Sequence, residues 1–179
     1  GVPGVGKTTL AAGAPSPIFI PVEDGLVGMD VPAFPKCDSY SDVREAMGTL
    51  ITEDHEFKTM VLDSADVLEP MIWDQVCEEG GKPSIGDFPY GKGFELAMDK
   101  WRELLRGMDI LRDKGMTIIV LAHSNIVRFE SPDSDGYDRY TMRLHKKANA
   151  AVHDWADAVL FANHETRVVS ASGGDRKRG

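Results

Sequence analysis

The sequence predicts an α/β fold built around a mostly parallel sheet. Three observations predict it. Four short apolar runs have the length of buried strands, segments with helical periodicity separate them, and a glycine-rich phosphate-binding motif opens the sequence. Strands that are apolar on both faces and alternate with helices are typical of parallel sheets covered on both sides. We therefore expect three layers, with helices on both faces of the sheet.

The first element is the stretch GVPGVGKT, residues 1–8, which fits the pattern G-x-x-x-x-G-K-[ST]. Its glycines let backbone N–H groups turn toward a phosphate, because no Cβ blocks the turn. Lys7 can reach the β- and γ-phosphates of a nucleotide, and the Thr8 hydroxyl can ligate Mg²⁺. A helix beginning near Lys7 adds its positive end. The predicted nucleotide-binding residues are Gly1, Val2, Pro3, Gly4, Val5, Gly6, Lys7, Thr8 and Thr9.

The remaining elements follow in order. The predicted strands are residues 17–22, 59–64, 116–122 and 157–162, and the predicted later helices are 41–52, 65–79, 93–114 and 147–155. In the longest helix, apolar residues recur at three- and four-residue steps, which places Trp101 in the core. The stretch FPYGKGFEL before it suits a tight turn into a helix, because Gly91 and Gly93 flank Lys92. A subunit contact or phosphate binding are open alternatives for this stretch.

Three predicted strands end in polar residues, where ligands of open α/β sheets bind. Asp63 can hold Mg²⁺ together with Thr8, although it could instead cap the next helix. Glu23 could orient the water that attacks the γ-phosphate, with Asp24 or a solvated turn as alternatives. His123 could sense the γ-phosphate or be a neutral core histidine. The predicted catalytic residues are therefore Lys7, Glu23, Asp63 and His123, and the predicted metal ligands are Thr8 and Asp63.

Composition sets limits on partners and compartment. The chain has 179 residues and a net charge of −9, which argues against a protein that binds nucleic acid over its whole surface. Cys37 and Cys77 show neither metal-site spacing nor a disulfide framework, so we expect a reducing, cytoplasmic compartment. The longest apolar run, 116–122, is too short to span a bilayer, and we expect no membrane partner.

One segment departs from the acidic balance. Residues 137–150 carry four basic side chains and one acidic one, with two tyrosines between them. The candidate contacts to DNA or to a neighbouring subunit are Arg139, Arg143, Lys146 and Lys147. A solvated β-hairpin lid is the alternative interpretation of this segment.

These stretches resemble a known family. GVPGVGKTT, FIPVEDG, MVLDSADVLEP, YGKG, IIVLAHS, DRYTMRLHKKA and WADAVLFA are similar to RecA-core ATPases. More narrowly, they resemble the phage-encoded RecA-like ATPases of single-strand annealing and homologous recombination. The resemblance runs from Gly1 to about Phe161. It implies a parallel sheet of order 5-1-4-3-2, in which the four predicted strands are strands 2 to 5 and strand 1 is missing before Gly1. We expect a RecA-like P-loop ATPase domain over 1–170 and a truncated or flexible tail over 171–179.

The resemblance also implies a function. ATP and Mg²⁺ would be the cofactors, Glu23 the water-activating glutamate, and His123 the γ-phosphate sensor. The expected partners are single-stranded DNA and further copies of the chain, in the cytoplasm of an infected bacterial host. Two other functions stay open: a small-molecule or nucleotide kinase, and a non-catalytic ATP-dependent adaptor or loader.

Overall fold

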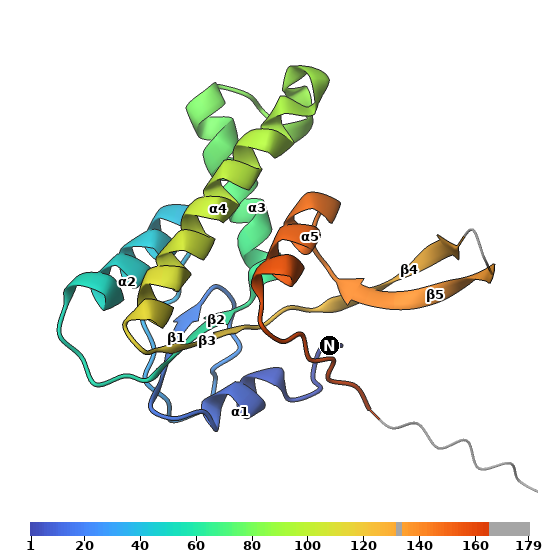
Figure 1. Cartoon of the computed structure of the whole chain (residues 1–179). Helices are drawn as coiled ribbons and strands as arrows, with labels where there is room; N and C mark the ends of the chain where they lie inside the picture. Colours follow the sequence, from blue (N-terminus) through green and yellow to red (C-terminus); the bar gives the residue numbers. More distant parts are fainter. Residues whose placement is uncertain (132–133, 165–179) are drawn as a thin grey trace, which may run out of the picture.

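The computed structural model describes residues 1–131 and 134–164 (Figure 1). Its elements are α1 (Lys7–Ala12), β1 (Pro17–Pro21), α2 (Tyr40–Thr52), β2 (Thr59–Asp63), α3 (Ala65–Gly80), the 3₁₀ turns η1 (Ile85–Asp87) and η2 (Pro89–Gly91), α4 (Lys92–Asp113), β3 (Thr117–Val120), β4 (Ser124–Ser131), β5 (Ser134–Met142) and α5 (Lys146–Trp155). The four later helices are confirmed, each with both ends within one residue of the prediction. In the described part of the chain, no helix is both long and apolar enough to cross a membrane.

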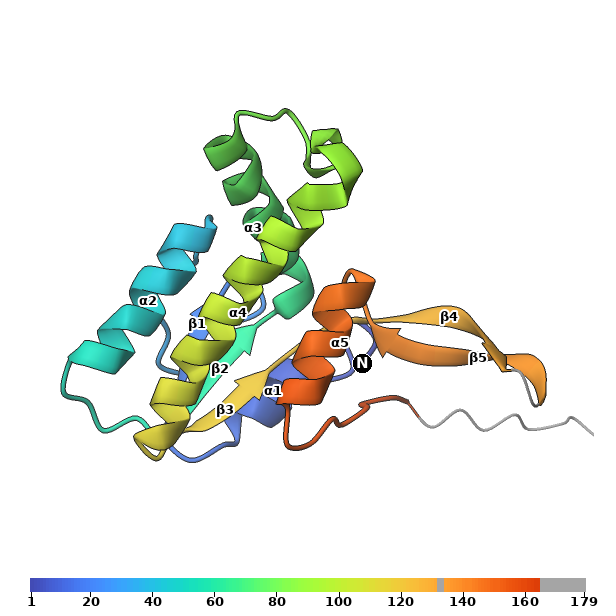
Figure 2. The same cartoon turned by 45° about the horizontal axis from the view of Figure 1, so that its top comes forward.

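The α/β class and a parallel sheet are confirmed. The sheet has the order β1-β2-β3, and both pairs are parallel. This arrangement contains the neighbours expected for the 4-3-2 part of the predicted order. Alternate strand residues serve two core clusters: Ile18 and Met60 belong to the larger one, with α2, α3 and α4, whereas Phe19 and Val61 pack with Ala11 of α1. Helices therefore cover both faces of the sheet (Figures 1 and 2).

The prediction of a strand at 157–162 is wrong. These residues form no strand, and Leu160 is 82% exposed. A strand needs a neighbour to satisfy its backbone groups, and among residues 1–131 and 134–164 none lies alongside. Gly1 occupies the intervening position: its terminal ammonium donates to Ala122 O (3.1 Å), its oxygen accepts from Ser124 N–H (3.0 Å), and a Cβ on it would lie 2.3 Å from Ala162 O. The predicted tail, 171–179, lies outside the described residues.

The long connection after β3 folds as an antiparallel hairpin that projects from the body of the molecule (Figure 2). Its strands pair Ile126 with Tyr140 and Phe129 with Tyr137. Directly opposed residues of an antiparallel pair share a face. The segment thus has the β-hairpin conformation that the lid interpretation of this segment expected.

The YGKG stretch makes the corner between α3 and α4. Tyr90 and Gly91 adopt positive φ angles of 55° and 70°. Gly93 follows in the first turn of α4, where a Cβ would lie 2.5 Å from the Ile85 carbonyl oxygen. The glycines of this stretch therefore serve a tight turn and a close packing contact, as the turn interpretation requires.

Replacing Gly93 with alanine should destabilise the fold. The added methyl group meets backbone, which cannot move aside cheaply, and overpacking of this kind typically costs about 1–3 kcal/mol. Gly48→Ala is the matched control, because Gly48 lies inside α2 and a Cβ there meets nothing within 4 Å. That control should gain about 0.5–1 kcal/mol from helix propensity. Urea denaturation of both variants checks the pair, and equal effects would contradict the packing argument.

Candidate functional site

The phosphate loop is formed by Gly1–Gly6, and α1 begins immediately after it. Gly4 and Gly6 take positive φ angles of 72° and 91°, which favour glycine. The Lys7 ammonium lies across the loop and donates to two of its carbonyl oxygens, Val2 O at 3.1 Å and Gly1 O at 3.4 Å. A phosphate would therefore compete with these oxygens for the Lys7 ammonium. The predicted loop residues are thus brought together, with Lys7, Thr8 and Thr9 in the first turn of α1.

Thr8 and Asp63 meet beside the loop. The Thr8 hydroxyl donates to Asp63 Oδ2 at 2.8 Å, and Asp63, the last residue of β2, is 3% exposed. Burial raises the pKa of the Asp63 carboxyl, the Thr8 hydrogen bond opposes this, and the charge of Glu23 adds to it. A cation at this position would therefore stabilise the ionised carboxylate.

The chemistry of these donors fits Mg²⁺. The two oxygens are hard ligands, and Mg²⁺ typically takes one or two protein ligands and completes its shell with phosphates and water. No group of three or more His, Cys, Asp or Glu side chains suited to a metal occurs in the described residues, so a dedicated all-protein metal cage is not seen there. Gly25 keeps the carboxylate open, because a Cβ there would lie 3.2 Å from Asp63 Oδ2 and 3.7 Å from Thr8 Oγ1. Thr8 and Asp63 are thus the residues that would hold the ion.

The strand pairing brings Glu23 to this site and turns Asp24 away from it. Val22 N–H donates to Asp63 O at 2.7 Å, which fixes the end of β1 beside the end of β2. Glu23 is partly buried and its charge acts on Asp63. Asp24 is 76% exposed and accepts from Lys36 Nζ at 3.3 Å. Of the two acids weighed from the sequence, Glu23 is the one with a position suited to a general base.

His123 is held by a carboxylate that the sequence analysis missed. Asp66, in the first turn of α3, accepts from His123 N–H at 2.8 Å and lies 3.1 Å from its ring Nδ1. Since an ionised carboxylate only accepts, Nδ1 carries the proton. Burial raises the pKa of Asp66, but the hydrogen bonds from the His123 backbone and from Arg143 outweigh it and hold the pKa below its usual value. His123 is thus fixed just beyond the end of β3, by its backbone and by its ring.

The four predicted basic contacts have different surroundings. Arg143 forms an ion pair with Asp66, with Nη2 at 2.5 Å from Oδ2, and Lys147 pairs with Glu95. The Arg139 guanidinium lies 4.3 Å from the centre of the Phe129 ring. Lys146 is exposed and makes no ion pair with any described residue. These side chains are therefore not equally available to a phosphate backbone.

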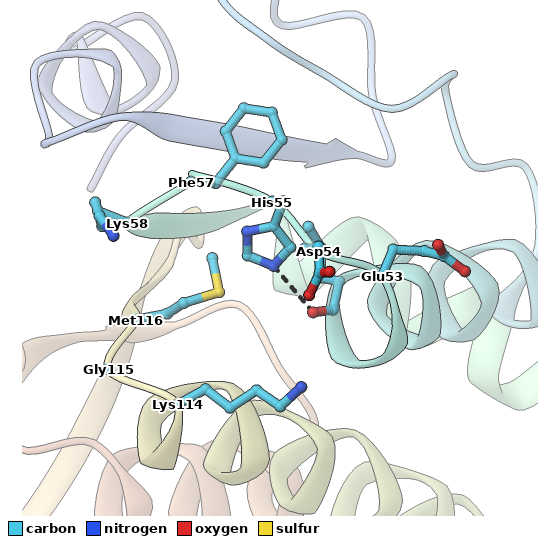
Figure 3. Close-up of a pocket in the computed structure, with 9 residues that line it drawn as sticks. Glu53, Asp54, His55, Phe57, Lys58, Lys114, Gly115 and Met116 are labelled. Atoms are coloured by element: carbon cyan, nitrogen blue, oxygen red, sulfur yellow. Dashed lines mark hydrogen bonds between the residues drawn. The ribbon is translucent and has the colours of Figure 1, made fainter.

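A separate pocket of about 200 Å³ lies where β2 and β3 begin, at the opposite ends of these strands from the phosphate loop (Figure 3). Its lining, which includes His55, Lys58, Lys114 and Met116, comes from the segments that precede β2 and β3. His55 points into this pocket while its Nε2 is bonded to Leu50 O at 3.0 Å. None of the predicted site residues lines it, because those residues follow the strands.

Replacing Asp63 with asparagine should stabilise the nucleotide-free protein at neutral pH and abolish its Mg²⁺-dependent stabilisation by nucleotide. The folded-state pKa of Asp63 is raised, so ionisation opposes folding as pH rises and is without effect below the unfolded value of about 3.9. The gain of the variant should therefore be largest near pH 7 and shrink toward pH 4. Thermal melts should show it, at about 2–4 °C per kcal/mol for a chain of this size.

Asp24→Asn is the matched control. Its carboxylate is exposed and pairs with Lys36 at 3.3 Å, so stability should change by no more than about 0.5 kcal/mol. A less stable Asp63→Asn protein at pH 7, or one that keeps its Mg²⁺-dependent nucleotide effect, would contradict the metal assignment.

Comparison with known proteins supports a nucleotide-binding family for this chain. The sequence profile of the AAA domain family matches residues 1–178, whereas no curated protein matches the chain. AAA domains typically bind and hydrolyse ATP, so the match supports a nucleotide-binding role for the loop at Gly1–Thr8. Because the match covers almost the whole chain and starts with this loop, the chain belongs to the AAA domain family.

Proposed function

We propose that the chain is a Mg²⁺-dependent ATPase whose nucleotide state controls binding to single-stranded DNA, in phage recombination or single-strand annealing. The observation that carries the ATPase part is the 2.8 Å contact between Thr8 and Asp63 beside the phosphate loop. Glu23 at the neighbouring strand end and His123 at the next supply the other two groups that hydrolysis needs. The RecA-like sheet order belongs to the same proposal.

Each residue has a role in hydrolysis. Lys7 leaves the loop carbonyls and binds the β- and γ-phosphate oxygens, where its charge stabilises the transition state. Glu23 accepts the proton of the attacking water as the water oxygen bonds to the γ-phosphorus and the bond to the β–γ bridging oxygen breaks. His123, whose Nδ1–H is held by Asp66, donates a hydrogen bond to the γ-phosphate from Nε2 when its ring is doubly protonated. Mg²⁺ bound at Thr8 and Asp63 would neutralise charge on the phosphate oxygens.

The hairpin supports the DNA part of the proposal. On one of its faces Phe129 lies 5.3 Å from Tyr137, and the Arg139 guanidinium covers the Phe129 ring. Exposed aromatic and cationic groups on a projecting element suit unpaired bases, which stack on rings whatever their sequence. On the other face Tyr140 is stacked on Phe161, with ring centres 4.5 Å apart. Tyr137 is therefore the better candidate of the two tyrosines for stacking.

A homo-oligomer is part of the proposal as well. Lys146 is exposed at the start of α5, and a neighbouring subunit could place its γ-phosphate there. Basic residues supplied in trans stabilise the transition state of related reactions. This role and DNA backbone contact are alternatives for Lys146.

Two variants separate binding from hydrolysis and test the ATPase directly. Lys7→Ala should abolish ATP binding by calorimetry in Mg²⁺, because the cation that reaches the β- and γ-phosphates is lost. Glu23→Gln should keep ATP affinity but lose about 10²–10⁴-fold in kcat, since the amide cannot accept the proton. The Asp24→Asn variant should hydrolyse ATP normally, because the Asp24 carboxylate is turned toward Lys36.

The same assays address the competing functions. Turnover without any added phosphate acceptor supports an ATPase and argues against a kinase. Tight ATP binding with almost no turnover in the unmodified protein would instead identify an adaptor or loader. Equal turnover by Glu23→Gln and the unmodified protein would assign the base elsewhere.

DNA binding should be weak, sequence-tolerant and dependent on few charges. If Arg139 and Lys146 alone contact phosphates, the log–log salt slope for a single strand is about −1.4, whereas four contacts give about −3. Tyr137→Ala should weaken binding by about 1–3 kcal/mol per stacked base. Tyr140→Phe is the control, because it keeps the ring that stacks on Phe161. Fluorescence anisotropy with an oligonucleotide at several salt concentrations measures both quantities, and no detectable binding at low salt would refute the DNA proposal.

A further inference from the structure

We propose that Asp66 is a positioning residue that holds His123 and the base of the β4–β5 hairpin in a single arrangement, so that neither moves without the other. The structure suggests it because one fully buried carboxylate accepts from both sides of the hairpin base. The inference extends the proposed function to the way the nucleotide site is connected to the hairpin. Its first test does not depend on that function.

The first step is the placement of Asp66. It lies in α3, three residues beyond the metal-site carboxylate Asp63, and its side chain is 0% exposed. A buried charge needs hydrogen-bond donors. Here the donors come from distant parts of the chain, 57 residues away at His123 and 77 away at Arg143.

The second step is what those donors belong to. His123 directly precedes β4 and Arg143 directly follows β5. The two residues are also joined by their backbones, since Arg143 N–H donates to His123 O at 2.8 Å. Asp66 therefore binds both ends of the hairpin where they enter the body of the molecule, and Arg143 does so with two bonds, from Nε (2.9 Å) and Nη2 (2.5 Å).

The third step is the consequence for His123. Its backbone N–H and its Nδ1 both face Asp66, so the position and the rotation of the ring are fixed together. The Nε2 nitrogen remains for a partner outside this cluster. Histidines whose second nitrogen is held in this way keep one tautomer and one orientation.

A further contact connects the same place to the phosphate loop. The oxygen of Gly1 accepts both from Ser124 N–H, the first residue of β4, at 3.0 Å and from Lys7 Nζ at 3.4 Å. When Lys7 moves to a phosphate, it withdraws from a carbonyl that also holds the hairpin. A continuous series of hydrogen bonds thus links the phosphate loop, His123 and the base of the hairpin.

The first test measures the hairpin without nucleotide. Arg143→Gln removes the ion pair at the hairpin base and leaves the buried Asp66 carboxylate with its bonds from His123, while the Arg143 side chain itself is 54% exposed. Amide hydrogen exchange of residues 124–131 and 134–142 should speed up by about five-fold or more, the low end of typical coupling effects. Arg102→Gln is the matched control, because it breaks an arginine–aspartate pair on α4 in which both side chains are exposed and should leave the hairpin unchanged. Unchanged hairpin exchange in Arg143→Gln would overturn the proposal.

The second test has two measurements. The first is the response of hairpin exchange to a non-hydrolysable ATP analogue with Mg²⁺, and the second is the kinetics of Asp66→Asn. In the unmodified chain the analogue should change hairpin exchange, and in Arg143→Gln this response should be reduced or lost although the loop amides are still protected. Asp66→Asn should also lower kcat by about 10-fold or more with a smaller change in KM, as loss of an outer-shell histidine partner does.

The two proposals fail differently. The connection between the nucleotide site and the hairpin would be overturned by either of two results, while the ATPase proposal stands. In the first, the analogue protects the loop amides of the unmodified chain but leaves its hairpin exchange unchanged. In the second, the hairpin of Arg143→Gln responds as much as that of the unmodified chain. No analogue binding by calorimetry would overturn the proposed function, and the exchange rates measured without nucleotide would still decide whether Asp66 holds the hairpin base. If Asp66→Asn does not fold, Arg143→Gln provides the decision.

Discussion

The buried carboxylate of Asp66 is the interaction on which the arrangement around the nucleotide site depends. A carboxylate that is removed from water stays ionised only when charged or N–H donors replace the water. Asp66 obtains them from His123 and Arg143. One turn later on α3, the buried Glu69 accepts from His145 N–H at 2.8 Å. Helix α3, which directly follows β2, is thus bonded both to the residue that precedes β4 and to the residue that precedes α5.

The acids near the loop show how function and stability oppose each other. Burial raises the pKa of Asp63 and of Glu69, whereas donors lower the pKa of Asp66. Asp66 is satisfied within the chain, whereas Asp63 has one hydroxyl donor, and the nearby charge of Lys7 does not offset its burial and the negative charge of Glu23. An incompletely neutralised carboxylate is unfavourable in the free protein and is for that reason well suited to a cation. Carboxyl groups whose pKa is raised by burial and by a neighbouring charge often mark functional sites for this reason.

The sequence predicted those features that are encoded locally. Helix α4 was located to within one residue because its apolar positions follow the helical period, and Asp63 and Glu23 were located because strand ends are visible as the limits of apolar runs. Asp66 was missed because its partners lie 57 and 77 residues away, a pairing that a single sequence does not reveal. The strand at 157–162 was wrong because strand formation depends on a neighbour as well as on apolar residues. The basic residues could be counted, but their pairing with Asp66 and Glu95 could not.

The resting position of Lys7 makes nucleotide binding an exchange rather than an addition. The carbonyl oxygens of Val2 and Gly1 already hold the ammonium, at 3.1 Å and 3.4 Å, so they act as an internal competitor for the incoming phosphate. In the proposed function, the affinity for a nucleotide is then the difference between two sets of contacts to the same cation. A ligand that binds the Lys7 ammonium no better than these carbonyl oxygens will not displace them. Selection for a multiply charged phosphate therefore begins at Lys7, before any contact with the base or the sugar.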